Sequence, residues 1–286
     1  MENALSINHL SKTYADFKLD DISFTVPKGC IVGLIGENGA GKTTTLKAAL
    51  NLIKNDGGQI QFFDQILDGK AKNLKEDIGV VLDAPCFHDL LKGRDINRMM
   101  KNIYSNWHDE SFLELMEKFK LPMDKRVKDY SKGMKMKLQI AVALAHDPKL
   151  LILDEATSGL DPVAREEMMD IFQEFIQDEE KAVLMSSHIT SDLDKIADYI
   201  VFIHGGKVVL QEEKESLLEA MGILKCGASQ FESLDANDYH RYRKNHFGYE
   251  VLVKNRSEMK KRYRDVMIDP VTIEEIMLFF VKGEVA

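Results

Sequence analysis

One segment constrains this chain more than any other, because residues 36–43 read Gly-Glu-Asn-Gly-Ala-Gly-Lys-Thr, the pattern GxxxxGK[ST]. An apolar run at 31–35 precedes it, and a helix-compatible run at 44–50 follows it. Glycines let successive backbone N–H groups converge on one anion, and the start of a helix adds partial positive charge there. Strand, glycine loop and helix form the context that a phosphate-binding loop requires. The segment therefore predicts such a loop, against the alternative of a glycine-rich turn without a ligand.

The residues of this loop have different expected tasks. Lys42 is expected to reach the β- and γ-phosphates of a nucleotide, and Thr43 is expected to hold Mg²⁺. The other residues expected to contact the nucleotide are Gly36, Asn38, Gly39, Ala40, Gly41 and Thr44.

Bulk properties exclude several classes of protein. The 286 residues carry a net charge of −9, which argues against wholesale nucleic-acid binding. No apolar run approaches the roughly 20 residues that cross a bilayer. The first three residues, Met-Glu-Asn, do not begin a signal peptide, and three scattered cysteines are typical of a reduced compartment. We therefore expect a cytoplasmic protein.

Apolar runs alternate with helical patterns along most of the chain. The expected strands are 22–26, 59–63, 78–82, 150–153, 182–185 and the hairpin 199–211 with Gly205-Gly206 at its turn, and the expected helices lie within 94–146 and 161–177. Strands that alternate with helices predict a mostly parallel sheet covered on both faces, which is an α/β fold.

The alternation ends near residue 221, and the charge balance changes there as well. Residues 222–286 hold 11 Lys/Arg and 10 Asp/Glu, so they carry +1 while residues 1–221 carry −10. We therefore expect a main domain at 1–221 and a small α+β accessory region at 222–286. The helical block at about 84–148 interrupts the main domain and is expected to be an inserted subdomain.

A second motif provides carboxylates for the same site. Residues 150–155 read Leu-Leu-Ile-Leu-Asp-Glu, a buried strand that delivers two acids to the carboxyl edge of the sheet, where ligands of such sheets bind. Asp154 suits Mg²⁺, and Glu155 then points at the γ-phosphate and can act as base on the attacking water. The alternative is an exposed acidic turn.

Between these motifs, residues 130–134 read Tyr-Ser-Lys-Gly-Met and open a helical run. Here the chain resembles the ATP-binding cassette (ABC) family, whose Leu-Ser-Gly-Gly-Gln signature sits about 20 residues before the Asp-Glu pair. Ser131 and Gly133 match, and the resemblance implies that they contact the γ-phosphate of ATP held by a partner subunit. A plain helix N-cap at Ser131 is the alternative.

Further matches follow in the order that the family has. Residues 158–161, Ser-Gly-Leu-Asp, resemble the D-loop. His188 resembles the switch histidine, which implies contact with the γ-phosphate and orientation of Glu155. Tyr14 resembles the aromatic residue that stacks on adenine. The alternatives are a structural histidine and a surface tyrosine.

One position departs from the family. After the strand at 78–82 the family usually has Gln, which touches Mg²⁺ and links the site to the membrane subunit, whereas this chain has Asp83. A carboxylate can still bind Mg²⁺, so Asp83 joins Thr43 and Asp154 as an expected metal ligand, but it adds negative charge beside the phosphates. An insertion that shifts the alignment is the alternative.

Two features of the C-terminal region are less specific. Residues 274–283 resemble the tail of a bacterial exporter-cassette subgroup, and the Tyr-Ser-Lys-Gly-Met form at 130–134 resembles the signature of exporter cassettes. A set of basic residues could contact phosphate or RNA, although a solvated face is the simpler interpretation: Arg241, Arg243, Lys244, Lys260, Lys261, Arg262 and Arg264.

The resemblance, over residues 1–221, implies a P-loop NTPase fold with an N-terminal antiparallel β subdomain. It also implies an ATP-hydrolysing, Mg²⁺-dependent subunit that works in pairs, homomeric or heteromeric, on the inner face of the membrane. Separate membrane-spanning subunits would carry the substrate, and the signature variant and tail favour export. The alternatives are a soluble cassette ATPase acting on ribosomes or DNA, and a regulatory cassette that is not an enzyme.

Overall fold

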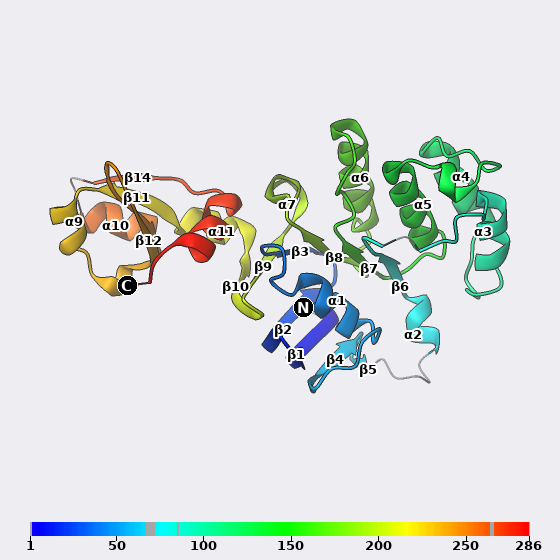
Figure 1. Cartoon of the computed structure of the whole chain (residues 1–286), viewed down its shortest axis with the longest axis horizontal. Coiled ribbons are helices and arrows are strands. Elements are labelled where there is room, and N and C mark those ends of the chain that lie inside the picture. Colours follow the sequence, from blue (N-terminus) through cyan, green and yellow to red (C-terminus); the bar gives the residue numbers. More distant parts are fainter. Residues whose placement is uncertain (1, 67–71, 85, 264–265, 286) are drawn as a thin grey trace.

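The computed structural model describes residues 2–66, 72–84, 86–263 and 266–285. Its central layer is a six-stranded sheet in the order β10-β9-β3-β8-β7-β6 (Figure 1). Five of these strands are parallel and β10 is antiparallel to β9. The six strands are β3 (Ile31–Ile35), β6 (Ile78–Val81), β7 (Leu150–Asp154), β8 (Ala182–Ser187), β9 (Tyr199–His204) and β10 (Lys207–Glu213). The expectation of a mostly parallel α/β sheet is confirmed.

The apolar runs form these strands because both faces of the sheet are covered. Every residue of β3, β7 and β8 is buried, as continuous apolar runs of parallel sheets predict. Helices next to the sheet include α1 (Lys42–Ala49), α2 (Lys72–Glu76), α6 (Pro162–Phe175), α7 (Thr190–Ile196) and α8 (Lys214–Ala220), and two further helices, given below, also contact it. Asp161 caps α6 through hydrogen bonds from the backbone of Val163 and Ala164.

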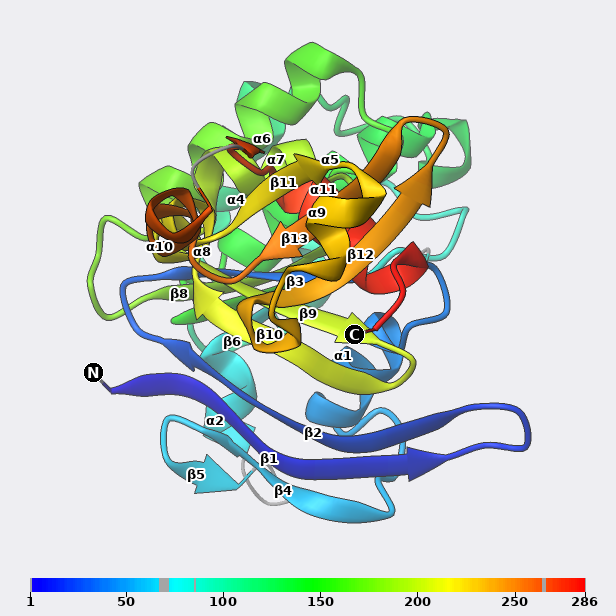
Figure 2. The same cartoon turned by 90° about the vertical axis from the view of Figure 1, so that its left-hand side faces the viewer.

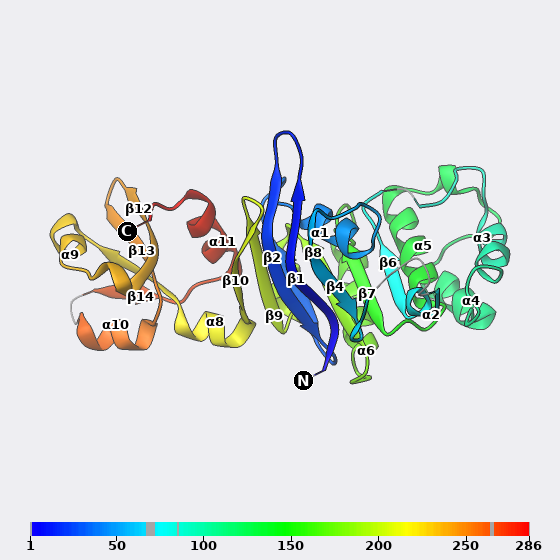
Figure 3. The same cartoon turned by 90° about the horizontal axis from the view of Figure 1, so that it is seen from below.

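The N-terminal sheet is antiparallel throughout, in the order β2-β1-β4-β5. Its strands are β1 (Asn3–Thr13), β2 (Lys18–Pro27), β4 (Gly57–Phe62) and β5 (Gln65–Ile66), and it packs along one side of the core (Figure 3). The sequence predicted β2 and β4 but not β1. Register shifts beside Ile7 and Leu10, with His9 at φ +53°, break the alternation of buried and exposed residues in β1.

The helical block stands at one end of the molecule and holds α3 (Gly93–Met100), α4 (Asp109–Lys118), the 3₁₀ turn Val127–Asp129 and α5 (Lys132–Leu144) (Figure 1). The expectation of helix over 94–146 is therefore corrected, because loops separate these elements. Lys120 adopts φ +55° just after α4, and Pro122 follows. Phe112, Met116 and Phe119 recur at helical spacing, i, i+4 and i+7, and all three are buried.

The other end of the molecule carries a third sheet, in the order β12-β13-β11-β14, which stands in front of β9 and β10 in Figure 2. Its elements are β11 (Gly222–Cys226), α9 (Ala228–Glu232), the 3₁₀ turn Ala236–Asp238, β12 (Tyr239–Asn245), β13 (Gly248–Val253), α10 (Arg256–Arg262), β14 (Met267–Asp269) and α11 (Ile273–Lys282). Helix α11 packs back on the core sheet, with the rings of Phe280 and Phe202 5.6 Å apart. Arg264, one of the basic residues noted in the sequence, lies outside the described residues.

Candidate functional site

The loop between β3 and α1 needs glycine at two points where the backbone is packed closely. A Cβ added at Gly36 would lie 2.4 Å from the carbonyl oxygen of Ile203 in β9. Gly41, the N-cap of α1, has φ +115°, and an added Cβ would lie 2.5 Å from Leu19. A side chain at Gly36 would push the loop away from β9, and one at Gly41 would push it away from β2, so the loop requires glycine at both points to curl over the start of α1.

Lys42 occupies the centre of this loop. Its Nζ donates hydrogen bonds to the carbonyl oxygens of Gly36 (2.7 Å) and Glu37 (3.2 Å) and lies 3.8 Å from Glu155 Oε1. The side chain is only 6% exposed. Burial lowers the pKa of Lys42, while the charges of Glu155, Asp154 and Glu37 oppose that shift. The ammonium is thus a preorganised cation beside the loop.

Asp154 at the end of β7 connects three elements. Its Oδ1 accepts hydrogen bonds from Thr43 Oγ1 (3.2 Å) and Ser186 Oγ (2.6 Å), and the side chain is 1% exposed. Thr43 and Asp154 thus place two hard oxygen atoms together, which is the donor chemistry that Mg²⁺ prefers. In the part of the chain that the structure describes, no group of three or more His, Cys, Asp or Glu residues could hold a metal ion. Mg²⁺ fits such a site because it usually keeps water and phosphate ligands.

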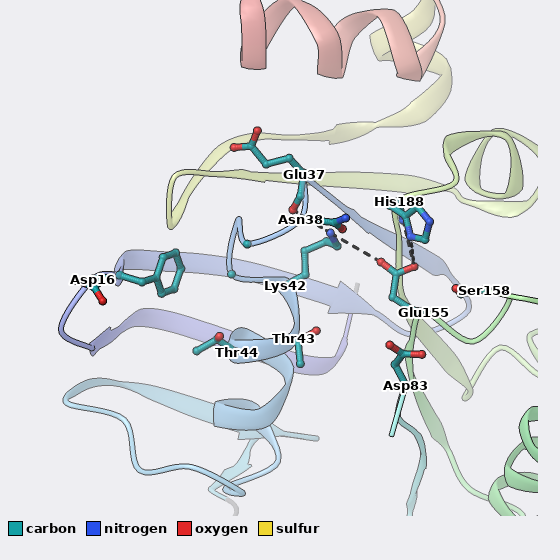
Figure 4. A pocket seen from close by; sticks show the side chains of 13 residues that line it. Asp16, Glu37, Asn38, Lys42, Thr43, Thr44, Asp83, Glu155, Ser158 and His188 are labelled. Atoms are coloured by element: carbon teal, nitrogen blue, oxygen red, sulfur yellow. Dashed lines mark hydrogen bonds and ion pairs between the residues drawn. The ribbon is translucent and has the colours of Figure 1, made fainter. Parts of the chain in front are cut away.

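Glu155 is held in an unusual backbone conformation, at φ +54°. Its N–H donates to the carbonyl oxygen of Ser186 (3.2 Å), and its Oε2 lies 2.5 Å from His188 Nδ1. The left-handed region is costly for a residue other than glycine, and such residues concentrate at functional sites. Figure 4 shows the Glu155 carboxylate between Lys42 and His188.

These residues surround one cavity of about 690 Å³, which is within the usual size of ligand sites. Its lining residues are Asp16, Phe17, Glu37, Asn38, Gly39, Gly41, Lys42, Thr43, Thr44, Asp83, Glu155, Ser158 and His188. The loop, the amino terminus of α1 and Lys42 supply positive potential on one side, and the carboxylates of Asp83 and Glu155 stand on the other. The arrangement can hold a polyphosphate and position a base beside its end.

Known proteins are similar to this chain in amino-acid sequence. The family model described as "ABC transporter" matches residues 19–158. The lantibiotic transport ATP-binding protein SrtF of Streptococcus pyogenes is 37% identical over 212 residues, which cover 73% of this chain and 90% of SrtF. The bacitracin transport ATP-binding protein BcrA of Bacillus licheniformis is 35% identical over 213 residues, or 73% of this chain and 69% of BcrA.

The chain belongs to the ATP-binding subunits of ABC transporters. A solved ATP-binding subunit of an ABC transporter superimposes on this subunit with a TM-score of 0.70 at 27% identity, over 75% of this chain and 91% of the other. The ABC subunit is thus an ATPase with the P-loop NTPase fold that the sequence predicted. Because its relatives are transport proteins, the alternative of an ATPase acting on ribosomes or DNA is not favoured.

Most of the predicted site residues of the ABC subunit meet at the cavity. Residues that line it are Asn38, Gly39, Gly41, Lys42, Thr43, Thr44, Asp83, Glu155 and His188. Asp154 lies directly behind Thr43, while Gly36 and Ala40 build the loop, Ala40 being 2% exposed. Sequence reasoning missed Ser186, whose hydroxyl accepts from the backbone N–H of Glu155 and donates to Asp154. No local signal indicates it, since Ser186 lies in β8, and Glu155 and Asp154 are 31 and 32 residues away along the chain.

Tyr14 does not line the cavity, whereas Phe17 does. The two residues share a turn in which the N–H of Tyr14 donates to the carbonyl oxygen of Phe17 (2.7 Å). The Tyr14 side chain is 45% exposed, with the Lys12 ammonium 5.6 Å from its ring centroid. Phe17 Cζ would lie 2.9 Å from a Cβ at Gly41, so this ring packs against the loop itself. The sequence shows two aromatic residues in this turn but no signal that distinguishes Phe17 from Tyr14.

Ser131 and Gly133 lie outside this cavity. The Ser131 hydroxyl accepts a hydrogen bond from the N–H of Met134 (3.2 Å) and caps α5, as the simpler interpretation anticipated. A Cβ at Gly133 would lie 3.3 Å from Leu160, so the signature segment packs on the D-loop. Within one chain, therefore, Ser131 and Gly133 lie near the site, next to the D-loop, but do not line its cavity.

Proposed function

We propose that this ATPase drives export of a peptide antibiotic of the lantibiotic or bacitracin kind through separate membrane-spanning subunits. The observation that carries the proposal is the gathering of Lys42, Glu155 and His188 around a cavity in a chain 37% identical to a lantibiotic transport ATP-binding protein. None of the described helices is long and apolar enough to span a bilayer. We propose that separate polypeptides provide the transport pathway and that this subunit binds on their cytoplasmic side.

Each residue of the site has a proposed role. The loop amides and Lys42 bind the triphosphate, and Thr43 and Asp154 hold Mg²⁺, with Asp83 within reach of the same region. When bound, Mg²⁺ neutralises phosphate charge. Glu155 accepts the proton of the attacking water, and His188 orients the Glu155 carboxylate through its 2.5 Å contact.

The adenine base has two aromatic residues available to it. Phe17 packs against Gly41 at the start of α1, and Tyr14 stands in the same turn at the rim of the cavity. Either ring offers a face on which a planar base can stack. We therefore propose that both rings contact the base, with Phe17 adjacent to the phosphate loop.

The second half of each site is proposed to come from another copy or a homologous subunit. The exposed hydroxyl of Ser131 and the backbone at Gly133 stand at the start of α5, a helix of 13 residues, where anions are favoured. ATP would lie between one chain's loop and the other's Ser131–Gly133 segment, so that binding closes the pair and hydrolysis reopens it. Residues 222–286 are proposed to be an accessory region, and no nucleic acid is involved.

The Glu155→Gln variant tests the catalytic assignment. The amide keeps the shape of the side chain but cannot accept a proton, so turnover should be lost while ATP binding remains. An ATP-bound dimer should then accumulate, which light scattering after size-exclusion chromatography detects. Glu166→Gln, on the exposed face of α6, is the matched control and should hydrolyse ATP normally. Near-normal hydrolysis by Glu155→Gln would remove Glu155 from this role.

Purification from detergent-solubilised native membranes tests the partners. Polypeptides with membrane-spanning helices should accompany the wild-type subunit, and cells that lack it should lose resistance to a lantibiotic or to bacitracin. Association with ribosomes or DNA in place of membrane polypeptides would contradict the proposal.

A further inference from the structure

Asp83 brings an additional negative charge to the nucleotide cavity. It follows β6 closely, lines the cavity with Lys42 and Glu155, and is 54% exposed. Figure 4 shows it on the side of Glu155 and His188, across the cavity from Asp16. Among the described lining residues, Lys42 is the one lysine or arginine. A free Asp83 carboxylate would therefore repel an arriving triphosphate.

Lys132 supplies a counter-charge to Asp83 from the signature segment. Its Nζ lies 3.9 Å from Asp83 Oδ1. The side chain passes over Gly159 of the D-loop, where an added Cβ would lie 3.0 Å from Lys132 Cδ and 3.3 Å from Nζ. Gly159 thus leaves the space through which the ammonium reaches Asp83. Asp83 and Lys132 also line a second cavity, of about 340 Å³, with Tyr130 and Gln139.

This ion pair is weak enough to be exchanged for another partner. The Lys132 and Asp83 side chains are 62% and 54% exposed, and 3.9 Å is a long contact for an ion pair. Exposed pairs of this kind contribute little to stability because water screens them. A triphosphate carries more negative charge than a single carboxylate and attracts an ammonium group more strongly. Lys132 can therefore leave Asp83 for a nucleotide at small cost.

We propose that Lys132 exchanges Asp83 for the phosphates of the partner chain's nucleotide when two chains close, an inference that rests on the proposed function. Lys132 adjoins Ser131 and its side chain is 62% exposed, so its ammonium is free to turn toward the nucleotide that the signature segment would contact. The exchange adds a contact across the interface and releases the Asp83 carboxylate into its own chain's cavity. Filling of one nucleotide site thus changes the charge at the other, which couples the two sites.

If the exchange occurs, part of the effect of Asp83 on dimer formation depends on Lys132. A double-mutant cycle measures this coupling between the two residues. The parent is the Glu155→Gln variant, in which dimers accumulate without turnover. Asp83→Asn, Lys132→Gln and the double variant are made in it, and the dimer fraction is measured by light scattering across ATP concentrations. Asp89→Asn is the matched control, because Asp89 pairs with Lys135 of the same helix at 3.5 Å and does not line the nucleotide cavity.

Asp83→Asn frees Lys132 in advance and should lower the ATP concentration for half-maximal pairing by about 1.4-fold to fivefold, the range that the loss of one exposed ion pair allows. Lys132→Gln should raise that concentration. In its presence Asp83→Asn should have a smaller effect, because only the repulsion between Asp83 and the nucleotide of its own chain is then removed. The control should leave pairing unchanged.

Two results would overturn the exchange while leaving the proposed function intact: an effect of Asp83→Asn that is the same with and without Lys132, or a Lys132→Gln variant that pairs like the parent. Failure of the parent to pair with ATP at all would remove the proposed function and this inference together.

Discussion

Replacement of Lys42 by alanine should abolish most nucleotide binding without unfolding the protein. The ammonium donates to two loop carbonyl oxygens, at 2.7 and 3.2 Å, and stands 3.8 Å from Glu155 Oε1. On nucleotide binding the same group can donate to phosphate, a hydrogen bond to a charged group that contributes about 1.5–3 kcal/mol. The affinity for ATP should therefore fall by about tenfold to about 100-fold.

The stability of the nucleotide-free protein should change much less. Removal of Lys42 takes away its hydrogen bonds to the carbonyl oxygens of Gly36 and Glu37. A typical hydrogen bond contributes about 0.5–1.5 kcal/mol to the free energy of unfolding. It also removes a buried charge whose desolvation already lowers its pKa. Because these terms oppose each other and the loop faces a cavity open to water, we expect a net loss below about 1.5 kcal/mol.

Thermal unfolding with and without ATP separates the two effects. At an ATP concentration 100 times the wild-type Kd, ATP should stabilise the wild type by about 2.7 kcal/mol and a variant with 100-fold weaker binding by about 0.4 kcal/mol. Lys47→Ala, on the same helix but outside the cavity, is the control and should keep the full ATP effect. An unchanged ATP-induced shift in Lys42→Ala would refute the assignment of the loop, and a large loss of stability without ATP would refute the balance argued for the apo protein.

Three further predictions concern the rest of the chain. Phe17→Ala and Tyr14→Ala should each weaken ATP binding, by up to about 1–3 kcal/mol for base stacking, but should leave inorganic tripolyphosphate binding unchanged in calorimetry; equal losses for both ligands would exclude contact with the base. Ser131→Arg should bind nucleotide yet fail to pair, and mixing it with Lys42→Ala should restore some ATPase activity, whereas strong activity of Ser131→Arg alone would contradict a shared site. His146 is fully buried, and burial lowers its pKa. Below about pH 6.5 the unfolded chain therefore takes up a proton that the folded chain does not, and stability should decrease as the pH is lowered, by at most about 1.4 kcal/mol per pH unit from this group. His146→Leu should flatten the slope of thermal stability against pH.

Local patterns in the amino-acid sequence predicted much of the fold. The continuous apolar runs of β3, β7 and β8 predicted buried parallel strands because both faces of such a sheet are covered. The hairpin β9–β10 followed from Gly205-Gly206 between two apolar segments. Where the backbone departs from regular geometry, pattern reading failed, as in β1 around His9 and between α4 and α5 around Lys120.

Most residues that line the cavity could be named from the sequence because each belongs to a short motif with its own chemistry. The glycine loop with Lys42 and the Asp154–Glu155 pair require only a strand and the turn that follows it. Sequence alone could not indicate which aromatic ring of the Tyr14–Phe17 turn enters the cavity. The two residues are only three positions apart, and either ring is suited to stacking on a base. The turn's conformation decides that Phe17 packs against Gly41.

What the amino-acid sequence by itself determined was therefore the set of local motifs and the kind of fold, since both depend on contacts between residues close along the chain. Only the tertiary structure decided which groups meet across long separations. Strand order β3-β8-β7 brings Ser186 between Glu155 and Asp154, and the packing of the D-loop on α5 brings Lys132 to Asp83. Such pairs leave no periodic trace in a sequence, because their geometry is set by how whole elements pack.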